Sequence, residues 1–225
     1  MRSRIAMSLF VASAALVFSA GCAAKTASVA PPSPQPLGGR ATSANPQPAT
    51  TPTAPAESGA VKVEKPVPPE TNPPGDIPDN QAFVAYKTTG GVTVKVPEGW
   101  SRQDSASKVL FTDKLNTIIL SWAPAATAPS VASFKSTDVP QLAKSQPAFE
   151  FKNVTAVKLP AGPGIHAVYR INSTPNAVTG KKYRLDVEQY TLFSNGKRAD
   201  LMLLSPVGSD NVDPWRIVSE SLTWK

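Results

Sequence analysis

KYRLDVEQYTLFSNGKRADLMLLS, residues 182–205, is the stretch that decides the fold. Asn195-Gly196 in its middle is the strongest short-range hairpin signal in the chain, because both residues tolerate the positive φ of a type I′ turn. Apolar residues recur on both sides of the turn, so we predict strands over 182–193 and 198–205. This stretch therefore predicts a long antiparallel hairpin.

Further elements are predicted on both sides of this hairpin. Short apolar runs indicate six more strands, over residues 83–87, 92–96, 108–112, 117–122, 149–159 and 164–171. Apolar spacing between Ser130 and Ser145 favours a helix that Pro140 breaks, with Ser130 and Asp138 as candidate caps. Asp213-Pro214 begins a second, short helix. This order of elements predicts an α+β domain built on an antiparallel sheet.

The N-terminus has the pattern of a secretory signal peptide. Arg2 and Arg4 precede an uncharged stretch over 5–18, which is too short for a transmembrane helix of about 20 residues. The sequence Ser19-Ala20-Gly21-Cys22 resembles the lipobox of bacterial lipoproteins. We therefore expect a signal peptide over 1–21 and a diacylglyceryl group on Cys22. The alternative is that Cys22, the only cysteine, is an ordinary free thiol.

Residues 22–80 have the composition of a stalk. The stretch from Ala23 to Asn80 holds 14 of the 24 prolines and few branched or aromatic residues. It has too little apolar surface to offset the entropy of folding, so we predict a disordered tether, either bare or carrying O-linked sugars. The folded domain is then expected over 81–225.

The charge distribution argues against nucleic-acid binding. The expected domain holds 17 Lys and Arg against 11 Asp and Glu, spread along the chain. Lys181-Lys182 is its longest basic run, and no aromatic residues alternate with cations as they do in proteins that bind single strands. The expected partners are the membrane, through the lipid on Cys22, and an unknown envelope protein or lipid ligand.

Residues capable of catalysis or metal binding are scarce. His166 is the only histidine, which excludes zinc sites built from Cys and His; it is either a structural residue or a general base for a nearby serine. Asp186 and Glu188 share a strand face with Arg184, a pattern typical of a solvated sheet surface, with an acid–base pair as the alternative. No phosphate loop, nucleophile elbow or calcium loop is present. We therefore assign no catalytic, metal or cofactor residue.

Recognition surfaces are expected on loops and aromatic residues. The turn Gly162-Pro163-Gly164 and the loop from Asn172 to Gly180 are the candidate recognition segments. The tryptophans are interpreted as core residues, although one or two in an exposed apolar groove is the alternative. They are Trp100, Trp122, Trp215 and Trp224.

Two segments carry a resemblance to a known family. VTVKVPEGW, residues 92–100, and the closing hairpin with the helix over 213–222 are similar to the PsbP-like superfamily. Signal peptide, lipobox, stalk and single domain also resemble the layout of its actinobacterial LpqN-type lipoproteins. The resemblance implies an α/β/α sandwich around an antiparallel sheet and a non-enzymatic role as a partner of larger complexes. It implies no functional residue.

These observations lead to one expected function and one alternative. We expect a lipoprotein anchored to the extracytoplasmic face of the bacterial cell membrane, whose domain is a non-catalytic interaction module for an envelope partner. The alternative is a carrier that binds a lipid or glycolipid between sheet and helix. An enzyme comes third.

Overall fold

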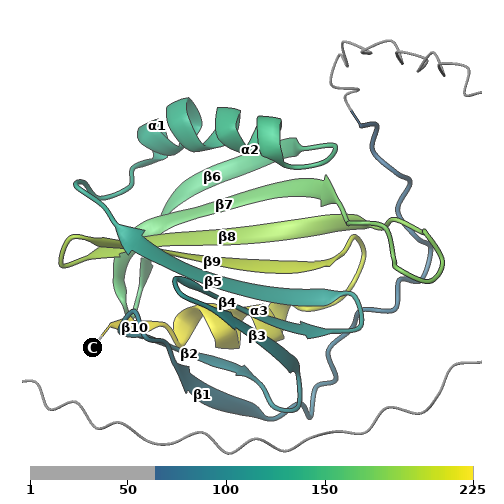
Figure 1. Ribbon diagram of the computed structural model, residues 1–225, viewed down its shortest axis with the longest axis horizontal. Helices are drawn as coiled ribbons and strands as arrows, with labels where there is room; N and C mark the ends of the chain where they lie inside the picture. The colour runs from purple at the N-terminus through teal and green to yellow at the C-terminus, as the bar shows by residue number, and fades with distance from the viewer. Residues whose placement is uncertain (1–63, 225) are drawn as a thin grey trace, which may run out of the picture. The chain divides into compact units, whose positions relative to one another are not determined.

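The computed structural model describes residues 64–224 of the chain. Cys22, the predicted signal peptide and most of the predicted stalk lie outside these residues. The described strands form two antiparallel sheets, of seven strands in the order β3-β4-β5-β9-β8-β7-β6 and of three in the order β1-β2-β10 (Figure 1). Together with the helices they make an α+β domain, so the predicted fold class is confirmed.

The larger sheet consists of β3 (Ser101–Ser105), β4 (Lys108–Asp113), β5 (Asn116–Pro124), β6 (Glu150–Leu159), β7 (Gly162–Asn172), β8 (Arg184–Ser194) and β9 (Lys197–Pro206). The smaller sheet consists of β1 (Phe83–Lys87), β2 (Val92–Pro97) and β10 (Thr223–Trp224). The helices are α1 (Val131–Ser133), the π-helical turn η1 (Phe134–Asp138), α2 (Val139–Ser145) and α3 (Val212–Glu220).

The β8–β9 hairpin lies in the middle of the larger sheet, and its turn is the one that the sequence predicts. Asn195 and Gly196 have φ values of 50° and 72°, the positive values that a type I′ turn requires. The two strands stay in register from this turn to the pair Leu185↔Pro206. β7 adds to the outer edge of β8 and β5 to that of β9, so the hairpin positions the rest of the sheet.

One face of the larger sheet packs against α3 and the smaller sheet. Leu120, Leu201 and Leu203 point to this face and are completely buried. Val94 of β2 and Val218 of α3 cover them from the other side and are equally buried. The predicted role of the tryptophans as core residues is confirmed, because all four lie in or against this cluster: Trp100, Trp122, Trp215 and Trp224.

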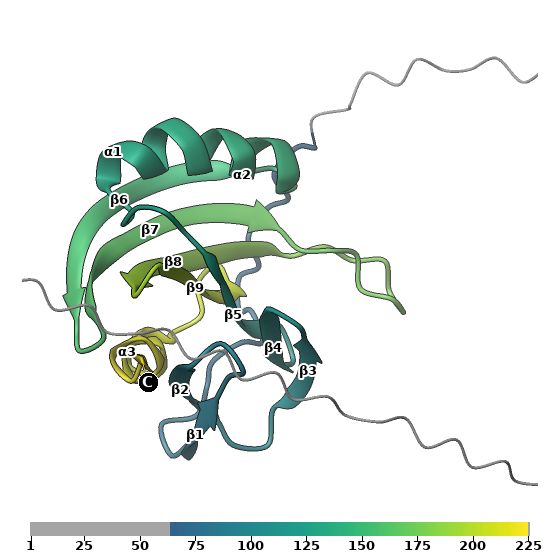
Figure 2. The same cartoon turned by 60° about the vertical axis from the view of Figure 1, so that its left-hand side comes forward.

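The opposite face carries a helical layer of α1, η1 and α2, which lies over β6 and β7 (Figure 2). Phe134 is buried in this layer, in a cluster with Val154, Ile165 and Ala167 of the sheet. Helices therefore lie on both faces of the antiparallel sheet. The layer that holds α3 also holds the three-stranded sheet, which the sequence pattern does not predict as a separate unit.

The helix predicted to break near Pro140 is divided there by the π-helical turn η1 into α1 and α2, without a gap in the segment, and Pro140 lies in the first turn of α2. Ser130 caps α1, and its hydroxyl accepts from Ser133 N at 3.0 Å. At Pro140 the chain widens to a π-helical turn, in which Val139 N donates to Phe134 O, and this wider turn accommodates the missing N–H of proline. Asp138 lies at the N-cap position of α2, as predicted, but its side chain makes no capping bond. Its carboxylate instead accepts from Arg198 Nη2 at 2.5 Å and joins the helical layer to the sheet.

Strand β3 is absent from the predictions because its sequence, SRQDS, holds no apolar residue. All five residues are exposed, and the strand pairs only with β4. Its position is fixed from the smaller sheet, where Tyr86 donates a hydrogen bond to Asp104 at 2.5 Å. The Arg102 guanidinium lies 5.2 Å from the centre of the same ring.

Residues 64–80, which composition assigned to the disordered stalk, run along the folded domain and are bonded to it. We call this segment the strap. Gly75 O accepts from the side chains of Asn116 at 2.7 Å and Asn211 at 2.9 Å. Ile77 N donates to Asn211 Oδ1 at 2.8 Å, and the Ile77 side chain is buried in the main core. Asparagine side chains thus supply the hydrogen-bond partners for the backbone of this Pro-rich segment. The domain therefore extends further toward the N-terminus than the predicted start at residue 81.

Replacing Asn211 tests whether the strap belongs to the fold. Asn211→Ala removes bonds to Gly75, Ile77 and Asn116 within the buried part of the domain. Each buried group left without a partner costs about 1–3 kcal/mol. We expect the free energy of unfolding to fall by at least about 2 kcal/mol in urea denaturation. Asn80→Ala, at an exposed strap position, is the matched control with an expected change below about 0.5 kcal/mol. Equal effects would contradict a docked strap.

Candidate functional site

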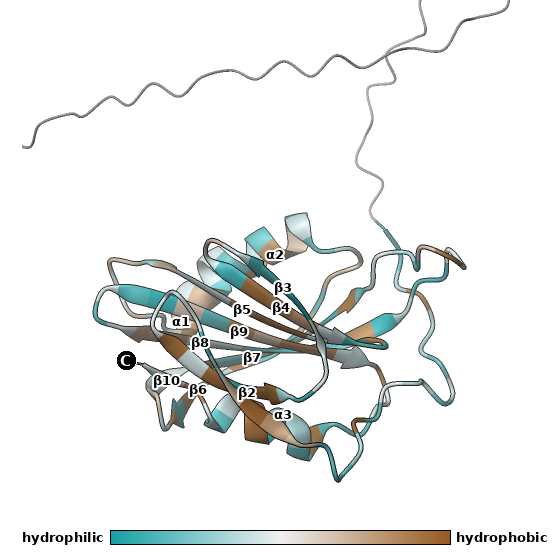
Figure 3. Cartoon of the chain, turned by 60° about the horizontal axis from the view of Figure 1, so that its bottom comes forward, coloured by the Kyte–Doolittle hydropathy of each residue, from teal (hydrophilic) through white to brown (hydrophobic). Residues whose placement is uncertain are grey.

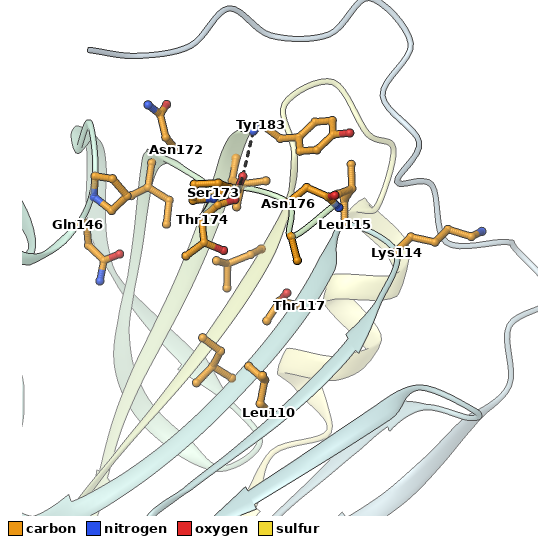
Figure 4. Close-up of a pocket in the computed structure, with 17 residues that line it drawn as sticks. Leu110, Lys114, Leu115, Thr117, Gln146, Asn172, Ser173, Thr174, Asn176 and Tyr183 are labelled. Atoms are coloured by element: carbon orange, nitrogen blue, oxygen red, sulfur yellow. Dashed lines mark hydrogen bonds between the residues drawn. The ribbon is translucent and has the colours of Figure 1, made fainter. Parts of the chain in front are cut away.

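An open groove of about 550 Å³ lies at one end of the larger sheet, on the face that carries the helical layer (Figure 4). Three segments form its walls: the β4–β5 turn with Lys114 and Leu115, the residues that follow α2, and the loop 172–183 between β7 and β8. The groove exists because the helical layer covers β6 and β7 and leaves the end of β5 and β9 without a helix (Figure 2).

The floor of the groove is apolar and its rim is polar. The floor residues come from five strands and are Leu110, Ile119, Ile171, Leu185 and Leu204. The rim residues carry hydroxyl and amide groups and are Thr117, Gln146, Asn172, Ser173, Thr174, Asn176 and Tyr183. Lys114 is the cation at the rim, and in the part of the chain that the structure describes it has no salt-bridge partner. Figure 3 shows apolar and polar stretches mixed along the strands, with apolar residues also on α3.

The loop 172–183 is held in place by its own hydrogen bonds. Asn176 Oδ1 accepts from the backbone N–H groups of Val178 and Thr179, both at 3.0 Å. Gly180 closes the turn with φ 67°, a value that glycine adopts without strain. At the base of the loop, Ser173 N donates to Tyr183 O, and Tyr183 N donates to the Ser173 hydroxyl. Val178 at its tip is 93% exposed, so the loop presents an apolar side chain beside the groove.

Asn172 joins the strap to this wall of the groove. Its Nδ2 donates to Glu64 Oε1 at 2.7 Å and to Lys65 O at 2.9 Å, and its Oδ1 accepts from Val67 N at 3.1 Å. Asn172 and then Lys182 hold the pKa of the Glu64 carboxyl below its ordinary value. The strap thereby fixes one rim of the groove from outside.

Arg184 lies beneath the same wall and is nearly inaccessible, with 3% of its surface exposed. Its guanidinium donates to Ala148 O at 2.7 Å and to Glu150 Oε2 at 2.8 Å. Lys152, and next Arg184, hold the pKa of Glu150 at about 2. The prediction that Arg184 belongs to a solvated strand face is therefore wrong: it is a buried residue that connects β8 to β6.

His166 lies on the other face of the sheet, in a pocket of about 310 Å³ near the start of α3. Its ring stacks on Tyr190 at 4.3 Å, and its Nε2 lies 3.0 Å from Glu188 Oε2 without hydrogen-bond alignment. Ser205 and Ser209 line the same pocket, yet within residues 64–224 His166 has no hydrogen bond to a serine. This geometry fits a structural histidine and provides no activated nucleophile.

Asp186 and Glu188 have separate partners. Asp186 accepts from Arg170 Nε at 2.6 Å, and Glu188 accepts from the Tyr190 hydroxyl at 2.8 Å. Burial raises the pKa of Glu188, but the contacts with His166 and Tyr190 outweigh it and lower that pKa. Glu188 therefore lacks the raised pKa that a general acid needs, and Asp186 is tied to Arg170, so the arrangement does not form an acid–base pair.

The two predicted recognition segments have different positions. The loop from Asn172 to Gly180 forms a wall of the groove. Gly162-Pro163-Gly164 instead lies inside β7, where a Cβ on Gly164 would stand 2.5 Å from Thr191 O of the neighbouring strand. That glycine serves close strand packing. The floor of the groove was not predicted, because its residues come from strands far apart in sequence.

Within residues 64–224, no three His, Cys, Asp or Glu side chains are grouped closely enough to hold a metal ion. The helices of that part of the chain are all too short or too polar to cross a membrane. The predicted lipidation site, Cys22, lies outside the described residues.

The solved structures to which this chain is similar include a cyanobacterial, a mycobacterial and a yeast protein. The cyanobacterial PsbP of Synechocystis has a TM-score of 0.46 and 14% identity, over 64% of this chain and 94% of that one. LpqN of Mycobacterium tuberculosis, described as involved in cell envelope biogenesis, has 0.38 and 17%, over 64% and 91%. The Ran-binding protein Mog1p of Saccharomyces cerevisiae has 0.40 and 10%, over 57% and 79%. No family model and no curated protein matches the sequence.

The pKa of Glu150 gives a pH-dependent prediction. Because the folded pKa is about 2 and the unfolded one about 4.3, the ion pairs of Glu150 stabilise the fold above about pH 5. That stability is lost as the pH falls through 2. We expect Glu150→Gln to lower the Tm at pH 7. The difference in Tm between this variant and the wild type is expected to disappear as the pH falls toward 2.

Thermal unfolding followed by circular dichroism between pH 2 and 7 measures this difference. Glu98→Gln is the control, because Glu98 is exposed and has no ion pair within the described residues. If the difference in Tm between Glu150→Gln and the wild type stays constant with pH, the ion pairs of Glu150 do not stabilise the fold.

Proposed function

We propose that this protein is a lipoprotein anchored through Cys22 to the extracytoplasmic face of the cell membrane, and that its domain is a non-catalytic module that binds an envelope protein at the groove. The observation that carries the proposal is the groove itself: an apolar floor, open to solvent, beside a wall that the strap and the loop 172–183 hold in place. Open apolar surface of this kind marks interaction sites.

The chemistry of the domain supports a binding role. The two carboxylates that line the pocket of His166 accept hydrogen bonds from Arg170 and Tyr190, so neither carboxylate is free to take a proton from a substrate. At the groove, the rim groups are hydroxyls, amides and one lysine. The described lining of the groove includes no histidine or carboxylate that could activate these hydroxyls as nucleophiles, so they are suited to orienting a partner by hydrogen bonds.

Binding of a lipid or glycolipid remains the second candidate, and the apolar floor is the observation that favours it. An acyl chain fits an apolar groove, and hydroxyl and amide groups on the rim suit a sugar headgroup. The groove is open to solvent and is not an enclosed cavity. This openness favours a protein surface over a carrier that shields its ligand from water.

A photo-crosslinking amino acid at Val178 tests the groove. Because this side chain is exposed beside the groove, we expect one defined adduct with an envelope protein in intact cells. The matched control is the same amino acid at Val212, which is 72% exposed at the start of α3. Adducts of equal yield at both positions would contradict binding at the groove. Native mass spectrometry of the purified protein then distinguishes the lipid alternative by its added mass.

Cys22→Ser tests the anchor independently. A thiol is needed to accept the diacylglyceryl group, and two acyl chains at about 0.8 kcal/mol per buried methylene hold a protein on a membrane. We expect wild type in the membrane fraction, labelled by an alkynyl fatty acid, and the variant unlabelled and released. Equal labelling of both proteins would rule out Cys22 as the lipidation site.

A further inference from the structure

The outer edge of β1 is a row of backbone groups without partners. In the antiparallel pair with β2, Thr88 N donates to Val92 O and Glu98 N donates to Ala82 O. Even-numbered residues of β1 therefore bond to β2, since bonded pairs alternate along an antiparallel ladder. The N–H and C=O groups of Phe83, Ala85 and Lys87 point outward, and the described part of the chain supplies no hydrogen-bond partner for them.

β1 differs in this respect from the two edges of the larger sheet. β6 has an irregular register between Phe151 and Asn153 and carries Lys152 at that point. The other edge, β3, carries the ion pair of Arg102 and Asp104. Bulges and charges of this kind are the usual protection of an edge strand. β1 runs in continuous register and has no proline, so its edge is open to a further strand.

The side chains on one face of β1 indicate which residues an added strand would carry on the same face. Lys87 and Lys95 lie on the same outer face, because Lys95 pairs with Ala85. Both lysines are exposed, and neither has a salt-bridge partner within residues 64–224. The small side chain of Ala85 leaves room for Lys95 to reach a strand added about 4.8 Å beyond β1. Acidic residues suit this face.

On the other face of β1, Val84 is 44% exposed, one of the large apolar side chains in the described part of the chain that remain open to solvent. A residue placed opposite Val84 on an added strand approaches its Cβ to about 5 Å. An apolar side chain there removes Val84 from water. The added strand is therefore expected to alternate acidic and apolar residues.

We propose that the edge of β1 is a docking surface for an extended segment of a partner protein in which acidic and apolar residues alternate. The segment adds as a further strand next to β1, and Phe83, Ala85 and Lys87 provide the backbone bonds. This mode of recognition derives affinity from main-chain hydrogen bonds and specificity from alternate side chains. The inference goes beyond the proposed function, because it adds a second surface, separate from the groove, to a binding module.

The probe for this surface is a blocked peptide of about eight residues that alternates Glu and Val, a length sufficient to span β1. NMR amide exchange of the mature chain measures its binding. We expect new protection at the amides of Phe83, Ala85 and Lys87. A peptide that alternates Lys and Val is the control and is expected to bind at least about tenfold more weakly, since its cations face Lys87 and Lys95.

Two variants of β1 make the test specific. Ala85→Pro removes one outward N–H and no bond to β2, and proline is accepted on edge strands; we expect binding of the Glu-Val peptide to weaken about tenfold. The double variant Lys87→Glu with Lys95→Glu changes exposed residues only. We expect it to reverse the order of affinity of the two peptides, so that the Lys-Val peptide binds more tightly than the Glu-Val peptide.

Several results would overturn the proposal. One is the absence of protection at the three amides, and another is equal affinity of the folded wild type for both peptides. The proposal would also be overturned if the peptide shifted NMR signals of the groove residues only. A dimer that pairs through β1, detected by sedimentation without peptide, would overturn it as well. Crosslinking at Val178 tests the groove separately, so failure at β1 and failure of the proposed function are distinguishable.

Discussion

The domain is organised by one constraint: a seven-stranded sheet has two apolar faces, and the chain supplies unequal cover for them. One face is closed by α3 together with the three-stranded sheet, and Leu201 of this face and Val218 of α3 are completely buried against each other's layer. The other face has a single helical segment, which Phe134 fixes over β6 and β7. The end of the sheet that this segment does not reach is the floor of the groove. The candidate site is therefore a direct consequence of how the core is covered.

The side-chain amide of Asn172 converts this uncovered end into a defined surface. Its four bonds join the strap, the end of β7 and the buried Arg184. A buried amide with all its partners in place is rigid, because losing any one of them leaves a polar group without compensation. The strap thus does more than lead into β1: its first residues, Glu64 to Val67, support a wall of the groove.

Local patterns predicted the parts of the fold that depend on local chemistry. Asn195-Gly196 predicted the central turn, and Ser130 predicted a helix cap. Strand β3 was missed because SRQDS has no apolar alternation. The strap was misassigned because composition measures how much apolar surface a segment can bury, whereas its order comes from asparagines more than a hundred residues away in some cases. The groove could not be predicted for the same reason: its floor joins Leu110 to Leu204 through the pairing of β5 with β9, which the sequence does not specify.

The central claim is that the groove is preformed, with its wall held by the strap. The most direct test is ¹⁵N relaxation of the mature chain, which gives backbone order parameters for the loop residues Asn172 to Tyr183. If Asn172 and the strap hold this wall, those order parameters are as high as in strand β8, at about 0.85, and fall in Asn172→Ala. Values below about 0.6 in the wild type would contradict the account, because the groove would then have no fixed wall.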